Sequence, residues 1–224
     1  MDAVHICAPM KPDDPAPAPL RSTYRHGDLR RALLEAGIEL ARVGGPEAVV
    51  LREATRRAGV VPNAAYRHFG SRQELLQAVR AAALAALAGA MEKELGRLRR
   101  RGAQADFARA SLRAVGTAYL RFALEETGLF RTAFGRPLEA PDPAAADRAG
   151  PGGLDPFQLL GAALDRMVEA GVLPPERRPG AEHLAWSAVH GLALLLVDGP
   201  LYGMARARVQ GLTERLLDMV EQGL

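Results

Sequence analysis

Apolar side chains recur three or four positions apart along nearly the whole chain, which is the spacing of one face of an α-helix. The clearest run places an apolar residue at every fourth position: Leu75, Val79, Ala83, Leu87, Met91 and Leu95. No segment alternates apolar and polar residues in the manner of a half-buried β-strand rich in Val, Ile, Thr and aromatic residues. The pattern therefore predicts an all-α protein.

Capping and helix-breaking residues divide this pattern into separate helices. Gly44–Gly45 is expected to end the first helix, and Ser71 with Glu74 forms a capping box that begins the longest one. Asp155, followed three residues later by Gln158, is a second N-cap signal. The expected helices cover residues 28–43, 51–58, about seven residues from 62, then 72–101, 105–126, 129–134, 155–171, 181–197 and 205–222.

The composition restricts the class of protein. With 48% hydrophobic and 25% charged residues, the chain is not disordered throughout. Its single cysteine, Cys7, allows neither a disulfide framework nor a thiolate metal site, which favours a reducing cytoplasm. The longest apolar stretch, residues 185–197, is too short to cross a bilayer, and residues 1–20 lack the pattern of a signal peptide. We therefore expect a cytoplasmic protein with no membrane partner.

Charge is distributed unevenly along the chain. Residues 21–73 carry ten basic and five acidic side chains, and residues 74–101 carry six and three. Residues 102–224 carry twelve basic and fifteen acidic ones. A basic segment before an acidic one is typical of a nucleic-acid-binding head on a neutral body, although a solvated basic face explains it equally well.

Residues 51–69 predict two short helices joined by a turn at Gly59. A helix of about seven residues is unstable alone, so the small residues around it and Phe69 are expected to pack it into a corner. Such a corner is a helix-turn-helix, whose second helix can enter the major groove of DNA. Helix corners of this kind also occur in proteins that never bind DNA.

The exposed residues of the second helix suit DNA. Asn63 and Arg67 can form hydrogen bonds with base edges. Tyr66, His68 and Arg72 can reach phosphates on either side. These five residues are therefore the first candidates for a nucleic-acid interface.

Residues Tyr24–Leu76 resemble the N-terminal DNA-binding domain of TetR-family transcriptional regulators, above all in the stretch AGVVPNAAYRHFGSRQELL. Farther along, Trp186 followed by His190 and Gly191 is similar to one C-terminal subgroup of that family. The resemblance implies a three-helix, helix-turn-helix domain joined by a long helix to a C-terminal helical domain for ligand binding and dimerisation.

The chain is expected to divide into three parts, a proline-rich tail and the two domains that the resemblance implies. These are a disordered tail over residues 1–20, a DNA-binding domain over 21–72 and a ligand-binding and dimerisation domain over 73–224. The resemblance also adds Arg25 as part of an arm near the DNA backbone or the minor groove. The DNA-binding residues that follow are Arg25, Arg52, Pro62, Asn63, Ala64, Tyr66, Arg67, His68 and Arg72.

Two positions depart from the family pattern. Val61 stands where Ser or Thr is usual before the proline, which removes an N-cap of about 1 kcal/mol and is expected to loosen the recognition helix. Thr55 stands where a small apolar residue is common, a change expected to affect packing only.

A homodimer is expected because one short helix reads too few bases, whereas two placed about 34–36 Å apart read successive major grooves. The operator should then be an imperfect palindrome. By resemblance, the helices over residues 181–197 and 205–222 form a four-helix bundle between the two protomers. The candidate interface residues are Leu192, Leu195, Leu196, Leu212, Leu216 and Met219.

A pocket for a small apolar or aromatic effector is expected between the helices of residues 105–197, and whether residues 137–156 cover it stays open. Its candidate wall residues, which could equally be plain core, are Tyr119, Phe122, Phe130, Phe134, Met167, Trp186 and His190. The predicted function is a sequence-specific DNA-binding regulator, a dimeric repressor whose operator affinity changes when this ligand binds.

Two alternatives stay open at this point. One is a helical small-molecule-binding protein that keeps the helix-turn-helix only as scaffold, and the other is a nucleoid-type protein that binds DNA without sequence preference. An enzyme is not expected, because the histidines are scattered and the chain has no nucleophile motif or phosphate loop. His183 and His190 lack a third ligand nearby, so we expect no metal and no cofactor.

Overall fold

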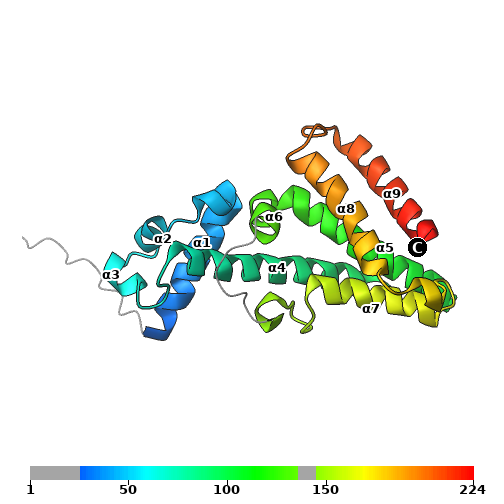
Figure 1. The fold of residues 1–224 in the computed structure, drawn as a ribbon, viewed down its shortest axis with the longest axis horizontal. Helices are drawn as coiled ribbons and strands as arrows, with labels where there is room; N and C mark the ends of the chain where they lie inside the picture. The colour runs from blue at the N-terminus through cyan, green and yellow to red at the C-terminus, as the bar shows by residue number, and fades with distance from the viewer. Residues whose placement is uncertain (1–25, 136–144) are drawn as a thin grey trace, which may run out of the picture.

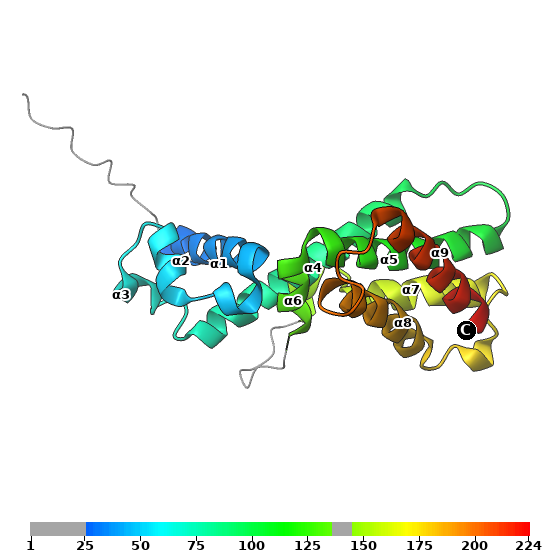
Figure 2. The same cartoon turned by 90° about the horizontal axis from the view of Figure 1, so that it is seen from above.

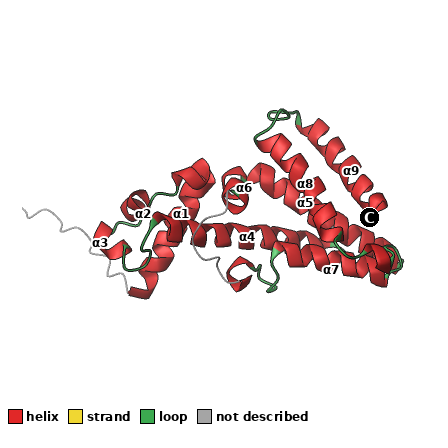
Figure 3. Cartoon of the chain, in the orientation of Figure 1, coloured by secondary structure: helices red, strands yellow, loops and turns green. Residues whose placement is uncertain are grey.

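The computed structural model describes residues 26–135 and 145–224. Within these ranges the regular elements are all helices (Figure 3), which confirms the fold class predicted from the apolar spacing. The predicted arm residue Arg25 and the tail over residues 1–20 lie outside the described residues, as do residues 136–144 of the predicted loop.

Three helices form a head at one end of the molecule (Figure 1): α1 (His26–Ala48), α2 (Leu51–Arg57) and α3 (Pro62–Ala65). The helical course of α1 is interrupted at Gly45, whose φ of 67° and ψ of −163° are not helical. The break therefore falls at the glycine pair that the sequence predicts. α4 (Arg72–Arg97) begins in the head and continues through the rest of the molecule.

The other helices form the body of the protein. They are α5 (Gln104–Glu125), α6 (Thr127–Phe134), α7 (Pro156–Glu169), α8 (Ala181–Val197) and α9 (Arg206–Gly223). Figure 2 shows α3 at the end of the molecule opposite to α7, α8 and α9. α8 and α9 pack against each other and against α5, so the last two helices lie on one side of the body.

α4 is the central helix, in contact with α1, α5, α6 and α7 and with a short 3-10 turn at Ala145–Arg148. Its buried apolar residues repeat the four-residue spacing of the sequence: Leu75, Val79, Ala83, Leu87 and Met91. Among the described helices, α4 alone is long and apolar enough to span a membrane, and half of its apolar window is buried. Because other helices cover it, a position in the protein core accounts for its composition.

The N-terminus of α4 differs from the predicted capping box in one bond. The hydroxyl of Ser71 accepts the N–H of Glu74 at 3.2 Å, as expected. The carboxylate of Glu74, however, accepts the N–H of Gly70 at 2.7 Å instead of that of Ser71. The helix ends at Arg97 instead of Arg101, because the apolar run stops before it and the arginines that follow have no core to face.

α3 is shorter than the predicted helix of about seven residues. It covers four residues and passes into a turn that ends where the N–H of Phe69 donates to the carbonyl of Ala65 at 2.9 Å. Val61, which precedes it, is 69% exposed and has no side-chain oxygen with which to cap a helix.

Candidate functional site

The corner between α2 and α3 packs tightly around small side chains. Ala54 and Ala65 are fully buried, Phe69 is nearly so, and the guanidinium of Arg30 lies 5.0 Å from the centre of the Phe69 ring. Gly59 makes the turn with a φ of 67°, which L side chains rarely adopt. The predicted helix-turn-helix is therefore present, with the tertiary support that its short second helix needs.

Thr55 is buried in this corner, at 2% exposure. Its hydroxyl donates to the carbonyl oxygen of Arg52 at 2.7 Å, and its own carbonyl accepts the N–H of Val60 at 3.1 Å. Because these polar groups have partners, the threonine fits a position where a small apolar residue is expected without leaving its hydroxyl unpaired.

The outer face of α2 and α3 presents polar side chains to solvent. The exposed residues among the predicted DNA contacts are Arg52, Asn63, Tyr66 and Arg67. Within the part of the chain that the structure describes, neither arginine forms a side-chain hydrogen bond or an ion pair. Both guanidinium groups are thus available to an anion opposite the head.

Three further predicted contacts lie beside this face. Ala64 and His68 are half-buried on α3 and in the turn after it. Pro62 is the first residue of α3, and its side chain lies outside the described part. The structure thus brings the predicted residues of the second helix together at one end of the head.

Arg72 differs from the other predicted DNA contacts because its guanidinium is engaged within the protein. Its Nε donates to the carbonyl of Val49 at 2.8 Å and its Nη2 to that of Pro46 at 2.7 Å. The side chain thereby ties the start of α4 to the connection between α1 and α2. A structural role is thus present, and contact with a phosphate stays a prediction.

Glu53 pairs with the two other arginines of α2. Its carboxylate accepts hydrogen bonds from Arg56 at 2.7 Å and from Arg57 at 3.3 Å. The hydrogen bond from Arg56 is the main cause that lowers the pKa of Glu53 to about 2, so the pair stays ionised at neutral pH. Arg52 and Arg67 therefore differ from Arg56 and Arg57, because no carboxylate within the described residues holds them.

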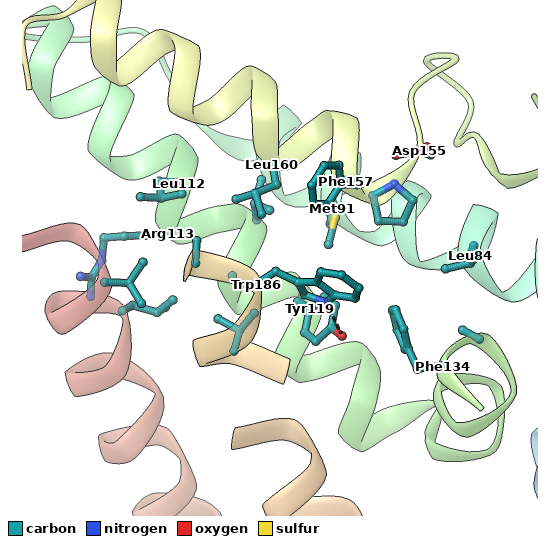
Figure 4. A pocket seen from close by; sticks show the side chains of 18 of the residues that line it. Leu84, Met91, Leu112, Arg113, Tyr119, Phe134, Asp155, Phe157, Leu160 and Trp186 are labelled. Carbon is teal, nitrogen blue, oxygen red and sulfur yellow. Dashed lines mark hydrogen bonds between the residues drawn. The ribbon is translucent and has the colours of Figure 1, made fainter. Parts of the chain in front are cut away.

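The body contains a cavity of about 410 Å³ between α4, α5, α6, α7, α8 and α9 (Figure 4). Its aromatic wall residues are Tyr119, Phe134, Phe157 and Trp186. Aliphatic wall residues that Figure 4 labels are Leu84, Met91, Leu112 and Leu160. A largely apolar cavity of this size is typical of a site for a small molecule.

Three of the predicted pocket residues line this cavity: Tyr119, Phe134 and Trp186. The other four predicted residues do not line this cavity. Phe122, Phe130 and Met167 are core residues with 6% exposure or less, and His190 contacts the wall residues Tyr119, Phe134 and Trp186 without lining the cavity itself. Phe157 is the aromatic wall residue that the prediction missed. Its place directly after the N-terminal proline of α7, three residues before Leu160, is the signal that could have found it.

Tyr119 joins two helices at the cavity wall. Its hydroxyl oxygen lies 2.6 Å from Nδ1 of His190 and accepts the indole N–H of Trp186 at 3.2 Å. Burial raises the pKa of the Tyr119 hydroxyl, and burial lowers the pKa of His190. Both side chains are therefore uncharged at neutral pH.

The charged wall residues are Arg113, Arg148 and Asp155, and each is engaged by other protein groups, although the buried Nε of Arg148 has no hydrogen-bond partner within the described residues. Asp155 caps α7, with its carboxylate accepting the N–H of Gln158 at 2.8 Å and its own N–H donating to the Gln158 side chain at 2.9 Å. This is the capping box that the sequence predicts. Arg113 forms ion pairs with Asp218 at 2.5 Å and with Glu221 at 3.6 Å, which fasten α9 to α5.

The exposed side of α8 and α9 is apolar in part. Leu195 is 42% exposed and Met219 is 59% exposed, while Leu212 and Leu216 are half-buried. Further exposed apolar residues of α8 are Leu184 and Leu194. The predicted interface residues Leu192 and Leu196 are buried inside the protomer, at 9% and 4% exposure, and do not belong to this surface. The correction arises because α8 packs against α5, α7 and α9, so its apolar residues divide between core and surface.

Two family models match the chain. Residues 33–79 match the model described as bacterial regulatory proteins of the tetR family, and residues 112–220 match a Tetracyclin repressor-like C-terminal domain. The chain belongs to the TetR family of transcriptional regulators. The helix-turn-helix of this TetR-family regulator is thus a DNA-binding domain, and the protein is a DNA-binding regulator instead of an enzyme. Members of the family also bind small-molecule ligands.

Solved structures share the fold of this regulator. A protein with unknown function from Rhodococcus sp. RHA1 is 28% identical, with a TM-score of 0.71 over 91% of this chain and 99% of that one. FadR from Bacillus subtilis in complex with stearoyl-CoA is 13% identical, with a TM-score of 0.62 over 87% and 98% of the two chains. RolR in complex with resorcinol is 19% identical, with a TM-score of 0.55 over 87% and 88%. No curated protein matches the chain.

Proposed function

We propose that this TetR-family regulator is a cytoplasmic, homodimeric repressor that releases its operator when a small apolar or aromatic effector occupies the cavity of the body. The observation that carries the proposal is the position of α6. Ala133 and Phe134, at its C-terminal end, line the cavity, while the same helix packs against α1 of the head. One short helix therefore contacts both the effector cavity and the DNA-binding domain.

Close contact between α6 and α1 supports this route. A Cβ added to Gly128 would lie 2.2 Å from the carbonyl oxygen of Ala41 and 2.4 Å from that of Arg42, so only glycine permits the approach. Arg80 of α4 donates to the carbonyls of Thr132 and Gly135 at 3.1 and 3.0 Å. If an effector displaces α6, both α1 and α4 must therefore shift with it.

The effector class is supported by the cavity wall and by proteins of the same fold. Aromatic and aliphatic side chains form most of the wall, which favours apolar surface on the ligand. FadR and RolR were each solved with a small molecule bound, stearoyl-CoA and resorcinol respectively. An effector acts on DNA binding only if it prefers one arrangement of the body over the other.

The proposed dimer joins the exposed sides of α8 and α9 from two protomers. Its apolar anchors are Leu195 and Met219, with Leu212 and Leu216 beside them. Gly191 lies in α8 with open space where a Cβ would stand, although glycine costs a helix interior about 1 kcal/mol relative to alanine. A close crossing with the partner's α8 would explain why glycine is tolerated there.

The proposed operator is an imperfect palindrome read by two copies of α3. In each protomer Asn63 and Arg67 face the bases with Arg52 beside them, and Tyr66 and His68 face the phosphates. Two recognition helices about 34–36 Å apart would enter successive major grooves on one side of the duplex.

Selection of random duplex DNA on the purified protein, with sequencing of the molecules retained at moderate salt, tests this function. We expect enrichment of a palindrome whose half-sites are one helical turn apart. Sedimentation analysis of the free protein should give the mass of a dimer. Binding with no enriched sequence and a steep salt dependence would replace the repressor by a non-specific DNA-binding protein.

A further inference from the structure

The two named side chains of the Trp-x-x-x-His sequence in α8 form hydrogen bonds with the same oxygen atom. Trp186 and His190 are one helical turn apart, and both form hydrogen bonds with the hydroxyl oxygen of Tyr119 on α5. Tyr119 and Trp186 line the cavity, whereas His190 does not. The two α8 side chains therefore determine which hydrogen-bonding capacity Tyr119 has left for a molecule inside the cavity.

The protons of this group can be assigned from its chemistry. An indole nitrogen is a donor only, so Trp186 occupies one lone pair of the Tyr119 oxygen. The distance of 2.6 Å to Nδ1 of His190 is short for an N–H donor and suits an O–H donor. Burial favours the uncharged form of both groups, so from this distance we assign the shared proton to the Tyr119 oxygen, which donates to Nδ1, and the proton of His190 to Nε2.

One lone pair on the Tyr119 oxygen then remains for a ligand. A hydroxyl oxygen offers one proton and two lone pairs, and the proton and one lone pair are used by His190 and Trp186. The position therefore accepts a hydrogen bond and cannot donate one. A carbonyl or carboxylate oxygen placed there would face an acceptor, which is unfavourable in a buried site.

The surrounding wall disfavours a formal charge on the ligand. The rings of Phe134, Phe157 and Trp186 and the side chain of Met91 lie around Tyr119 in the cavity (Figure 4). The carboxylate of Asp155 is held at the N-terminus of α7, and Arg113 at the far end is paired with two acidic residues of α9. Arg148, the third charged wall residue, also has a partner within the protein, although its buried Nε forms no hydrogen bond within the described residues. An unpaired charge buried among these rings would lose its hydration without compensation.

We infer that the effector is an uncharged aromatic or apolar molecule that carries a hydroxyl or N–H group, whose hydrogen the oxygen of Tyr119 accepts. The inference rests on the proposed function in placing the effector in this cavity. It gives His190 a role in specificity, because the proton that Tyr119 donates to it leaves the tyrosine oxygen an acceptor only, while Trp186 occupies one lone pair of that oxygen.

Calorimetric titration of the purified full-length protein with four naphthalene derivatives tests the inference. The probes are β-naphthol, its methyl ether, β-naphthoate and the β-naphthylmethylammonium ion. One neutral hydrogen bond corresponds to an affinity ratio of about three- to tenfold, so β-naphthol should bind that much more tightly than its ether. Both charged probes should bind more weakly than β-naphthol.

Variants assign the preference to the tyrosine oxygen. Tyr119→Phe should reduce the ratio between β-naphthol and its ether to about one, because the acceptor is gone. Trp186→Phe should keep the ratio, since it returns a second lone pair to Tyr119 and leaves a ring in the wall. Tyr202→Phe is the matched control, because Tyr202 is 76% exposed and does not line the cavity.

Each outcome decides the matter. Equal binding of β-naphthol and its ether, a ratio that survives in Tyr119→Phe, or tighter binding of either charged probe would overturn the inference and leave the proposed effector cavity intact. Failure of all four probes to bind would overturn the effector cavity itself, and the inference with it. Operator selection, which uses no ligand, tests DNA recognition separately.

Discussion

Nε of Arg42, in α1, lies 2.8 Å from Oε2 of Glu126, the residue between α5 and α6. The ion pair joins the DNA-binding head to the body at the place where α6 begins. Both side chains are partly exposed, at 43% and 34%, so solvent screens their attraction. The pair therefore contributes little to the free energy of unfolding, and its main effect is to fix the position of the head relative to the body.

A double-mutant cycle with Arg42→Ala and Glu126→Ala should give a coupling of about 0.2–1 kcal/mol in the free energy of unfolding. We expect Arg42→Ala to change the effector concentration that releases half of the operator by more than this small free energy would account for. Fluorescence anisotropy of labelled DNA measures that concentration. Arg31→Ala, at the exposed Arg31–Glu35 pair of α1, is the control. Equal effects of Arg31→Ala and Arg42→Ala on release would argue against a role of this pair in coupling.

Gly128→Ala should destabilise the protein by about 1–3 kcal/mol, the usual cost of forcing a methyl group into a packed contact. The new Cβ would meet the carbonyl oxygens of Ala41 and Arg42, which are backbone atoms that cannot rotate away. Thermal unfolding measures the loss, and operator affinity should fall with it because α1 must shift. An unchanged melting temperature would show that α6 and α1 do not lie this close in solution.

Arg67→Ala should weaken binding to the selected operator by about 1–3 kcal/mol while changing unfolding by less than about 0.5 kcal/mol. Its guanidinium is exposed and forms no bond within the described part of the chain, so the loss should fall on DNA alone. Arg56→Ala is the matched control, because Arg56 lies on the neighbouring helix α2 and is paired there with Glu53. Gel-shift titrations of both variants on the operator and on a scrambled duplex measure the affinities. Equal losses of affinity on the two duplexes would show that Arg67 does not recognise bases.

Leu195→Glu should shift the protein from dimer to monomer, because a buried unpaired carboxylate at an apolar interface is costly. Sedimentation velocity measures the change, and operator affinity should fall in parallel. Val43→Glu is the control, since Val43 is 82% exposed on α1 and is not one of the proposed interface residues. A Leu195→Glu protein that stays dimeric would move the interface away from this side of α8.

His190 should make the protein sensitive to mild acid. Burial lowers the pKa of His190 in the folded state, so the unfolded chain takes up a proton first as the pH falls. Its contribution to stability is complete above the unfolded pKa of about 6.5 and is lost as the pH falls from there through the folded pKa. Urea unfolding between pH 7 and 5 should show a steeper loss in the natural protein than in His190→Gln. If the free energy of unfolding falls equally with pH in the natural protein and in His190→Gln, His190 is not buried against Tyr119 in solution.

Elements specified by local signals could be predicted from the sequence. The four-residue apolar spacing of α4, the Asp155–Gln158 cap of α7 and the break at Gly45 all depend on residues close to one another in the chain. Helix ends without such a signal, such as the end of α4, were placed less well.

The division of apolar residues between core, cavity and surface could not be predicted. Leu192 and Leu195 are three residues apart in a helix that is apolar on most sides, so its spacing does not show which face the protomer covers. Phe130 and Phe134 share a helix, yet only Phe134 borders empty space, which depends on neighbours distant in sequence. Arg72 likewise bonds to carbonyls more than twenty positions earlier in the chain.

Trp186 is the only tryptophan of the chain, and it stands in the cavity wall. Near-ultraviolet emission excited at the red edge of protein absorption therefore arises from one place, beside the atoms that an effector would touch. The intrinsic fluorescence of the unlabelled protein therefore reports on this cavity. A compound library can be screened by changes in the wavelength and intensity of that emission. The same signal can be followed while the protein sits on DNA, so occupancy of the cavity and release of the duplex can be timed in a single sample.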